Sequence, residues 1–209
     1  MAYILGFFTA DGSMYRTNRK THFIAIEITD KELLEKIRDV LGSNHKIGLR
    51  RVGHKKWKPI YRLQIGSKVI FDNLTKLGLT QNKSLTLPFL SVPKQFLGDF
   101  TRGYFDGDGC VQFGKYWRKD RNEWKWQLST SFTSGSEKFL IGLFNVLKLL
   151  VCGGNVRGKK GGYELVFGQH DSIALFRFMY HNVPEGLFLE RKHATFQKAF
   201  KILKVAGVV

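Results

Sequence analysis

The fold is decided by the stretch Tyr3-Ile4-Leu5-Gly6-Phe7-Phe8-Thr9-Ala10-Asp11-Gly12 and by a near-copy, Phe100-Thr101-Arg102-Gly103-Tyr104-Phe105-Asp106-Gly107-Asp108-Gly109. In both copies, an apolar run carries a glycine, a second small residue four positions later, and then Asp-Gly. Residues four apart lie on the same face of a helix. Small residues on that face, here Gly6/Ala10 and Gly103/Gly107, let a second helix backbone come close. The pattern therefore predicts two helices that pack together and bring Asp11 and Asp108 side by side.

Two carboxylates at neighbouring helix C-termini are unfavourable, because both helix dipoles and their mutual repulsion oppose the charge. A divalent cation would resolve this conflict, and oxygen ligands suit Mg²⁺ or Ca²⁺. A backbone carbonyl at a helix end could add a further ligand. Gly12 and Gly109 are expected to stop the helices by entering the left-handed conformation.

The Asp-Gly pairs also suit two other structures, a hairpin turn and a calcium-binding EF-hand loop. A single Asp-Gly is most simply a hairpin turn, but two copies with the same spacing favour the helical interpretation. An EF-hand that starts at Asp106 is excluded, because its sixth position is Val111 rather than glycine and its twelfth is Trp117 rather than glutamate.

The two stretches resemble the paired motifs of the single-chain LAGLIDADG homing endonucleases. The glycine at the third position, the acid at the eighth and the glycine at the ninth match in both copies. Thr9 departs from the usual acid at the sixth position, which is not the metal ligand in that family, and Thr101-Arg102 is a more polar opening than usual.

The resemblance implies a set of catalytic and metal-binding residues. Asp11 and Asp108 would each hold Mg²⁺, or Mn²⁺ or Ca²⁺ in the same sites, near one scissile phosphate per strand. The backbone carbonyls of Ala10 and Gly107 would complete the ligands. A lysine is expected near the attacking water or the transition state, at Lys83 and Lys192, with phosphate clamping as the alternative role. Gln64 would help to order water in the first half only, because Val166 stands at its counterpart.

Composition points to a folded chain with a polyanionic partner. The 209 residues are 43% hydrophobic, and 34 Lys and Arg against 17 Asp and Glu give a formal net charge of +17. Such a charge suggests nucleic acid, although a ribosomal or membrane-surface protein would share it. No apolar run is long enough for a transmembrane helix, and a signal peptide is not expected. Cys110 and Cys152 lack CxxC spacing, so we expect reduced, buried thiols, an intracellular protein of unspecified compartment, and no zinc site.

The residues that follow each motif repeat one order of elements. Tyr61-Arg62-Leu63-Gln64-Ile65-Gly66 corresponds to Tyr163-Glu164-Leu165-Val166-Phe167-Gly168, and similar runs start at Gly78 and Gly186. We therefore predict an α+β fold of tandem αββαββα repeats, with units at 1–92 and 93–209. This order is also that of the LAGLIDADG fold, in which two curved antiparallel sheets form a DNA-binding saddle.

Local signals place the helices within each repeat. Asp30 is a plausible N-cap for a helix through Leu41. Ser67 is expected to start another helix, with four inward residues: Val69, Ile70, Leu74 and Leu77. Ser134 is expected to cap a helix that runs to about Leu150.

Basic residues gather at the tips and on one face of the predicted strands. Such a sheet can lie as a ribbon in the major groove of DNA. We expect lysines at the tips to meet phosphates and Arg or Gln at strand centres to meet base edges. For any single residue, a solvated surface charge is an equal alternative. The candidates are Arg16, Arg19, Lys20, Arg50, Arg51, Lys55, Lys56, Lys58, Arg62 and Gln64 in the first half, and Lys115, Arg118, Lys119, Arg121, Lys125, Gln127, Arg157, Lys159 and Lys160 in the second.

The sequence is thus interpreted as a monomeric, pseudo-two-fold, metal-dependent homing endonuclease that cuts both strands of a long asymmetric DNA site. Two alternatives stay open at this point. One is an RNA-splicing maturase of the same fold that binds intron RNA. The other is a DNA-binding regulator that has lost cleavage, which the presence of both acids and both lysines disfavours.

Overall fold

The structure is a computed structural model that describes residues 1–50, 58–81, 83–183 and 186–205. The first half contains α1 (Ala2–Asp11), β1 (Gly12–Arg16), β2 (His22–Ile28), α2 (Lys31–Val40), β3 (Ile47–Arg50), β4 (Ile60–Gly66) and α3 (Lys68–Lys76). Two short 3-10 helices, η1 (Lys83–Leu85) and η2 (Lys94–Phe96), lie in the connection. The second half contains α4 (Leu97–Asp108), β5 (Gly109–Arg118), β6 (Glu123–Ser134), α5 (Glu137–Leu147), β7 (Asn155–Lys159), β8 (Gly162–Phe167), α6 (Gln169–Met179) and α7 (Glu190–Leu203). The predicted tandem αββαββα order is confirmed, with α7 as an addition to the second repeat.

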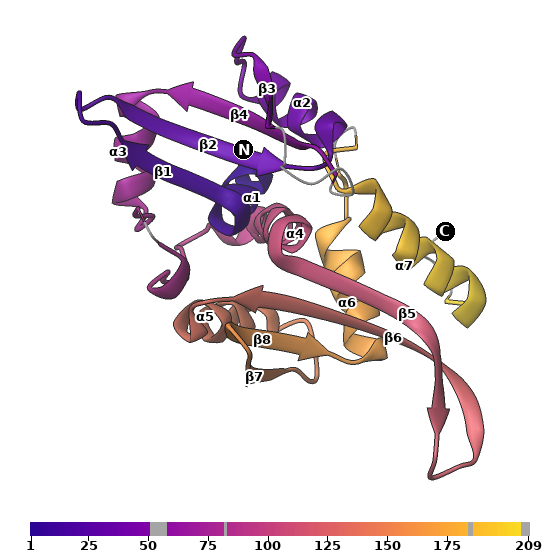
Figure 1. Cartoon of the computed structure of the whole chain (residues 1–209). Coiled ribbons are helices and arrows are strands. Elements are labelled where there is room, and N and C mark those ends of the chain that lie inside the picture. Colours follow the sequence, from indigo (N-terminus) through magenta and orange to yellow (C-terminus); the bar gives the residue numbers. More distant parts are fainter. Residues whose placement is uncertain (51–57, 82, 184–185, 206–209) are drawn as a thin grey trace.

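Each half builds one antiparallel four-stranded sheet with the same topology. The strand orders are β1-β2-β4-β3 and β5-β6-β8-β7. The registers correspond as well, since Gly12 pairs with Ile26 and Gly109 with Phe132. Helices cover one face of each sheet and leave the other face open, while the β5–β6 hairpin curves away past the rest of its sheet (Figure 1).

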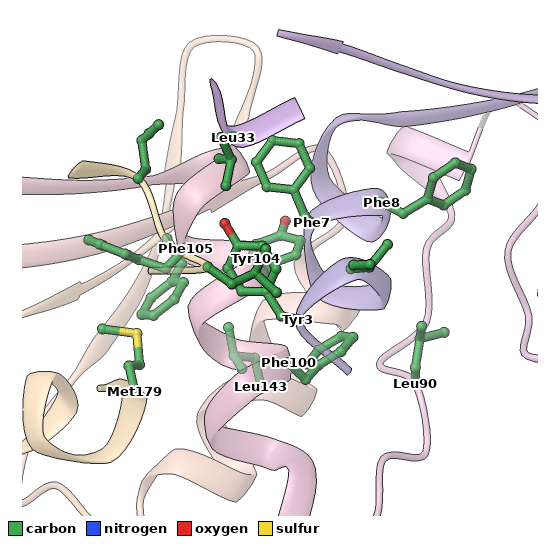
Figure 2. Packing of buried hydrophobic residues seen from close by; sticks show 14 of the residues in the cluster. Tyr3, Phe7, Phe8, Leu33, Leu90, Phe100, Tyr104, Phe105, Leu143 and Met179 are labelled. Carbon is green, nitrogen blue, oxygen red and sulfur yellow. The ribbon is translucent and has the colours of Figure 1, made fainter. Parts of the chain in front are cut away.

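The centre of the molecule is the contact between α1 and α4, which lie side by side between the two sheets (Figure 1). Aromatic side chains from both helices, including Tyr3, Phe7 and Tyr104, pack around this seam (Figure 2). A Cβ added at Gly6 would lie 2.0 Å from the carbonyl oxygen of Phe100, and one at Gly103 would lie 1.9 Å from that of Tyr3. The two helix backbones therefore touch at reciprocal positions that admit only glycine.

The helix stops at Gly12 and Gly109 differ from the prediction. Both residues are extended, with φ −76° and −93°, rather than left-handed. A Cβ at Gly12 would lie 2.3 Å from the ring of Phe8, and one at Gly109 would lie 2.2 Å from the ring of Phe105. These positions need glycine because an aromatic ring from the preceding turn occupies the space of a side chain.

Three local expectations about helices also needed correction. Ser136, rather than Ser134, caps α5, because its hydroxyl accepts a hydrogen bond from the Phe139 N–H at 3.3 Å.

Ser67 caps α3 as predicted, yet Val69 and Leu77 point outward, with exposed fractions of 70% and 44%. Phe71 is the buried residue of that helix, and Ile70 and Leu74 pack beside it against the core. Asp30 stands at the N-cap of α2 but its side chain makes no capping hydrogen bond.

The additional helix α7 fills a position that stays open in the first half. Its Phe196 ring lies 5.9 Å from that of Phe105 on α4 and 5.1 Å from that of Phe176 on α6. The residues that correspond to this pair in the first half, Phe8 and Leu74, instead line an apolar cavity of about 550 Å³. Among the described helices, none is both long enough and apolar enough to cross a membrane.

Candidate active site

Asp11 and Asp108 end the two central helices. A Cβ added at Gly107, on α4, would lie 3.2 Å from Oδ2 of Asp11, so the Asp11 carboxylate reaches over the end of the opposite helix. Desolvation, followed by the negative charge of Asp108, raises the pKa of Asp11 to about 6. Desolvation also raises the pKa of Asp108, and the ammonium groups of Lys83 and Lys192 offset part of the rise. The two acids therefore share one electrostatic environment.

The predicted lysines lie directly beneath these helix ends. Lys83, on η1, is buried and its Nζ donates to the carbonyl oxygen of Gly12 at 2.5 Å. Lys192, in the first turn of α7, is buried and donates to the carbonyl oxygen of Gly109 at 2.6 Å. Gly12 and Gly109 follow the two acids, so the lysines occupy matched places although they come from different kinds of element. A cation at a helix C-terminus is stabilised by the helix dipole.

The two lysines differ in how completely they are held. Lys192 also donates to the carbonyl oxygens of Phe105 at 2.5 Å and Asp106 at 2.9 Å. An ammonium group has three N–H donors, so Lys192 uses all of them on backbone carbonyls. Burial lowers the pKa of Lys192 to about 8 and also lowers that of Lys83. In this arrangement Lys192 acts on its surroundings through its charge rather than through a free N–H group.

Gln64 and several predicted DNA contacts share the open faces of the two sheets. In β4, Gln64 alternates with the buried residues Leu63 and Ile65 and pairs with Ala25. By the same alternation, the open face of the first sheet holds Arg50 and Arg62, and that of the second holds Arg118, Lys125, Gln127, Arg157 and Lys159.

Other candidates lie elsewhere. Arg16 and Lys115 fall on the helix-covered faces, where Arg16 lies 5.0 Å from the Phe71 ring and Lys115 5.3 Å from the Trp126 ring. Lys58 precedes β4, and the remaining described candidates stand in the strand-connecting turns: Arg19, Lys20, Lys119, Arg121 and Lys160. Arg51, Lys55 and Lys56 lie outside the described residues.

Acidic residues hold several of the open-face arginines in place. Glu27 pairs with Arg50 at 3.1 Å and with Arg62 at 3.4 Å. The hydroxyl of Tyr15 accepts a further hydrogen bond from Arg62 at 2.8 Å. In the second sheet, Arg157 pairs with Glu164 at 2.9 Å. These arginines are oriented before any partner binds.

Sequence reasoning missed several residues of these faces. Tyr15 and Gln112 share the open faces with the predicted contacts, as does Asn155, which pairs with Val166. Strand alternation from Arg118 along β5 and from Arg157 along β7 would have found Gln112 and Asn155, whereas Tyr15 depends on the register of β1 against β2. Two buried residues of α4, Arg102 and Asp106, were also missed, because they bind the backbone of Met179, Leu187 and Leu189, far away in the sequence.

The cysteines are free, but neither is buried as expected: Cys110 is half-buried and Cys152 is exposed. It lies near His170 and Asp171, with their possible ligand atoms within 4.8 Å of one another. Asp171 already accepts the Cys152 N–H at 2.8 Å. Both His170 and Asp171 stand in the first turn of α6, where the helix dipole opposes a cation. This cluster is therefore explained as a loop contact.

Comparison with known proteins finds a matching domain in the first half and a similar fold over the whole chain. Residues 1–77 match the LAGLIDADG-like domain. Over 99% of this chain and 90% of the other, the structure matches the meganuclease I-SmaMI bound to uncleavable DNA, with a TM-score of 0.66 and 14% identity. The chain therefore shares the fold of LAGLIDADG meganucleases. Its fold is likewise similar to those of two further LAGLIDADG proteins. I-LtrWI bound to target DNA has a TM-score of 0.62 and 16% identity over 98% of this chain and 90% of the other. I-AabMI bound to uncleaved DNA has a TM-score of 0.61 and 16% identity over 97% and 90%.

A curated protein shares sequence with this chain over a shorter span. The DNA-directed RNA polymerase subunit Rpo1C of Methanocaldococcus jannaschii is 30% identical over 113 residues. The match covers 52% of this chain but 12% of that subunit. The similarity thus concerns a small segment of a much longer protein.

Proposed function

We propose that this protein is a site-specific DNA endonuclease that hydrolyses one phosphodiester bond in each strand of a long asymmetric target. One observation carries the proposal. Asp11 and Asp108 end two helices that pack against each other, and a buried lysine donates a hydrogen bond to the carbonyl oxygen of the glycine that follows each acid. Acids placed so that burial and mutual repulsion raise their pKa are typical of functional sites.

The donor set fits a hard divalent cation. Two carboxylates and the backbone carbonyls of Ala10 and Gly107 offer oxygen atoms alone, as Mg²⁺, Mn²⁺ or Ca²⁺ prefers. A solved structure of I-SmaMI holds uncleaved DNA in the presence of calcium ions. When bound, such a cation supplies positive charge for the phosphate and lowers the pKa of the attacking water. The carboxylates of Asp11 and Asp108 would hold the cation in its place.

The lysines and Gln64 would assist in different ways. Lys83 and Lys192 place positive charge beside the acids, which favours the ionised carboxylates needed to hold metal. The same charge attracts a phosphate into the site. Gln64 lies on the open face of the first sheet and would orient water there, with no counterpart in the second half, where Val166 stands.

The open faces of the two sheets would bind the double helix. The net charge of +17 provides non-specific attraction for phosphates. Arginines and glutamines on the strands can read base edges in the major groove, while turn lysines contact the backbone. Because the two halves carry different side chains, the preferred target is not palindromic, and one chain supplies both acids, so a monomer suffices.

Cleavage of a randomised-site DNA library by purified protein and Mg²⁺ tests the proposal. We expect double-strand breaks at one selected sequence, and Asp108→Asn should slow cleavage by more than about 10²-fold while DNA binding persists. If the wild-type protein cuts no member of the library and instead binds a structured RNA tightly, the maturase alternative replaces the proposal.

A further inference from the structure

The second motif differs from the first at two positions on one face of its helix. Arg102 stands where the first motif has Leu5, and Asp106 stands where it has Thr9. Arg102 and Asp106 are four residues apart on α4 and therefore lie one above the other. Both are 1% exposed. Two charged side chains this deeply buried need specific partners.

Arg102 binds the chain just before α7. Its Nε donates to the carbonyl oxygen of Leu187 at 3.2 Å, and its Nη1 donates to that of Met179 at 2.6 Å. Its Nη2 pairs with Asp99 at 2.8 Å. The guanidinium group thus ties the end of α6 and the segment before α7 to α4.

Asp106 binds the backbone N–H of Leu189, the residue just before α7. Its Oδ2 accepts the N–H of Leu189 at 2.9 Å and the hydroxyl of Tyr3 at 2.8 Å. Leu189 is the N-cap of α7. A carboxylate that accepts an N–H at a helix N-terminus is stabilised by the helix dipole and satisfies a backbone donor that the helix leaves unpaired. The start of α7 is therefore fixed to α4.

Lys192 lies three residues after Leu189, in the first turn of α7. Its ammonium group reaches back to carbonyl oxygens of Phe105, Asp106 and Gly109, in the last turn of α4 and just beyond it. The last turn of α4 therefore both holds the start of α7, through Asp106, and accepts the hydrogen bonds of Lys192. A small movement of Leu189 would displace Lys192 from all three carbonyls.

The first half has a different arrangement. The hydroxyl of Thr9 donates to the carbonyl oxygen of Leu5 at 2.7 Å, within its own helix. Lys83 is carried by the short helix η1 instead of a long helix. Within the described part of the chain, neither Leu5 nor Thr9 has a side-chain hydrogen bond to the segment that carries Lys83.

We propose that Arg102 and Asp106 are positioning residues that hold the start of α7 and so place Lys192 beside Asp108. The second half-site depends on this clamp, whereas the first does not. The consequence for cleavage rests on the proposed endonuclease function, but the placement of Lys192 does not.

Lysine acylation followed by mass spectrometry tests the placement without DNA. The test variants carry the residues of the first motif, Asp106→Thr and Arg102→Leu. In each, we expect Lys192 to be acylated at least about tenfold faster than in the wild type, with Lys83 unchanged. Asp106→Asn retains an oxygen acceptor for Leu189 and should keep Lys192 protected. Thr9→Val, the matched control in the first motif, should leave both lysines protected.

Strand-resolved cleavage tests the consequence. With Asp106→Thr, one strand should be cut about tenfold or more slowly, so nicked DNA accumulates, while Thr9→Val cuts both strands as the wild type does. Folded variants in which Lys192 stays protected would overturn the clamp. Exposed Lys192 with equal cutting of both strands would overturn its role in cleavage.

A measurement on the wild type covers the case in which the variants do not fold. The clamp requires the Leu189 amide to exchange hydrogen as slowly as the amides inside α7, and fast exchange there contradicts it. If wild-type protein cuts no DNA but Lys192 responds as described, the proposed function fails and the clamp stands.

Discussion

The ammonium group of Lys192 donates to the carbonyl oxygen of Gly109 at 2.6 Å, one residue beyond the acid that ends α4. With its bonds to Phe105 and Asp106, this contact satisfies three carbonyls at once. Lys192→Met would remove the ammonium donor from all three carbonyls, of which that of Phe105 keeps the Gly109 N–H. Because an unmet buried hydrogen-bonding group costs about 1–3 kcal/mol, we expect the free energy of unfolding to fall by about 2–4 kcal/mol.

Urea denaturation measures this loss, and Lys83→Met is the matched comparison. Lys83 donates to one carbonyl in the structure, that of Gly12. Its replacement should therefore destabilise the protein less. Equal losses for the two variants would contradict the difference in how the lysines are held.

Gly103→Ala should destabilise the whole protein. The new methyl group would lie 1.9 Å from the carbonyl oxygen of Tyr3, so α1 and α4 must separate. Overpacking of this kind costs about 1–3 kcal/mol or more, and cleavage should decline with it because both acids move. Gly158→Ala is the control, since no atom lies within 4 Å of the added Cβ. Thermal unfolding of the two variants gives the comparison.

Metal-free protein should lose stability as the pH rises from about 4 to about 6. The pKa of Asp11 is raised to about 6 from an ordinary value of 3.8. Between these values the folded state holds more protons than the unfolded state, so a rise in pH favours unfolding. Thermal unfolding in EDTA from pH 4 to 7 measures the decline.

Two comparisons test the cause of that decline. Saturating Mg²⁺ should reduce it, because the cation compensates the ionised carboxylates. Asp11→Asn should reduce it, with the remainder due to Asp106 and Asp108, whose pKa values are also raised, and should raise the metal-free melting temperature above that of the wild type at pH 7. A steady gain in stability from pH 4 to 6 in EDTA would contradict the raised pKa of Asp11.

Glu27→Gln should weaken discrimination between DNA sequences. Glu27 holds Arg50 and Arg62 on the open face of the first sheet. Without it, the arginines are free to reach phosphates, so affinity for random DNA should rise while the ratio of specific to random binding falls. Glu35→Gln makes the same charge change on α2, where Glu35 pairs with Lys31. Binding titrations at several salt concentrations separate the two, and an identical response of both variants would assign the effect to net charge alone.

Much of the architecture could be predicted from the duplicated motif. The four-residue spacing of Gly6 and Ala10 defines a helix face, and the second copy indicates what that face contacts. Strand alternation then assigns residues such as Gln64 to a face of the sheet. These inferences succeed because they depend on local periodicity.

Other features could not be predicted from the sequence because they depend on where a side chain points or on a segment distant along the chain. The glycine at position 12 is required by the ring of Phe8, not by its own backbone conformation. The partner of Asp106 is the amide of Leu189, 83 positions away. Its burial and that of Arg102 become intelligible only when α7 is placed against α4.

Because of the apolar cavity beside Phe8 and Leu74, the first half should be less stable to local unfolding than the second. In the second half, α7 adds Phe196 and Phe200 to the core, whereas the matching volume of the first half is unfilled. Less apolar surface is buried there, so the first sheet should be the region that opens first in sub-global fluctuations of the native state. Since α1 belongs to that half, Asp11 is attached to the less stable unit and Asp108 to the more stable one. When the native state opens locally, Asp11 should therefore move away from Asp108 while Asp108 keeps its place on α4.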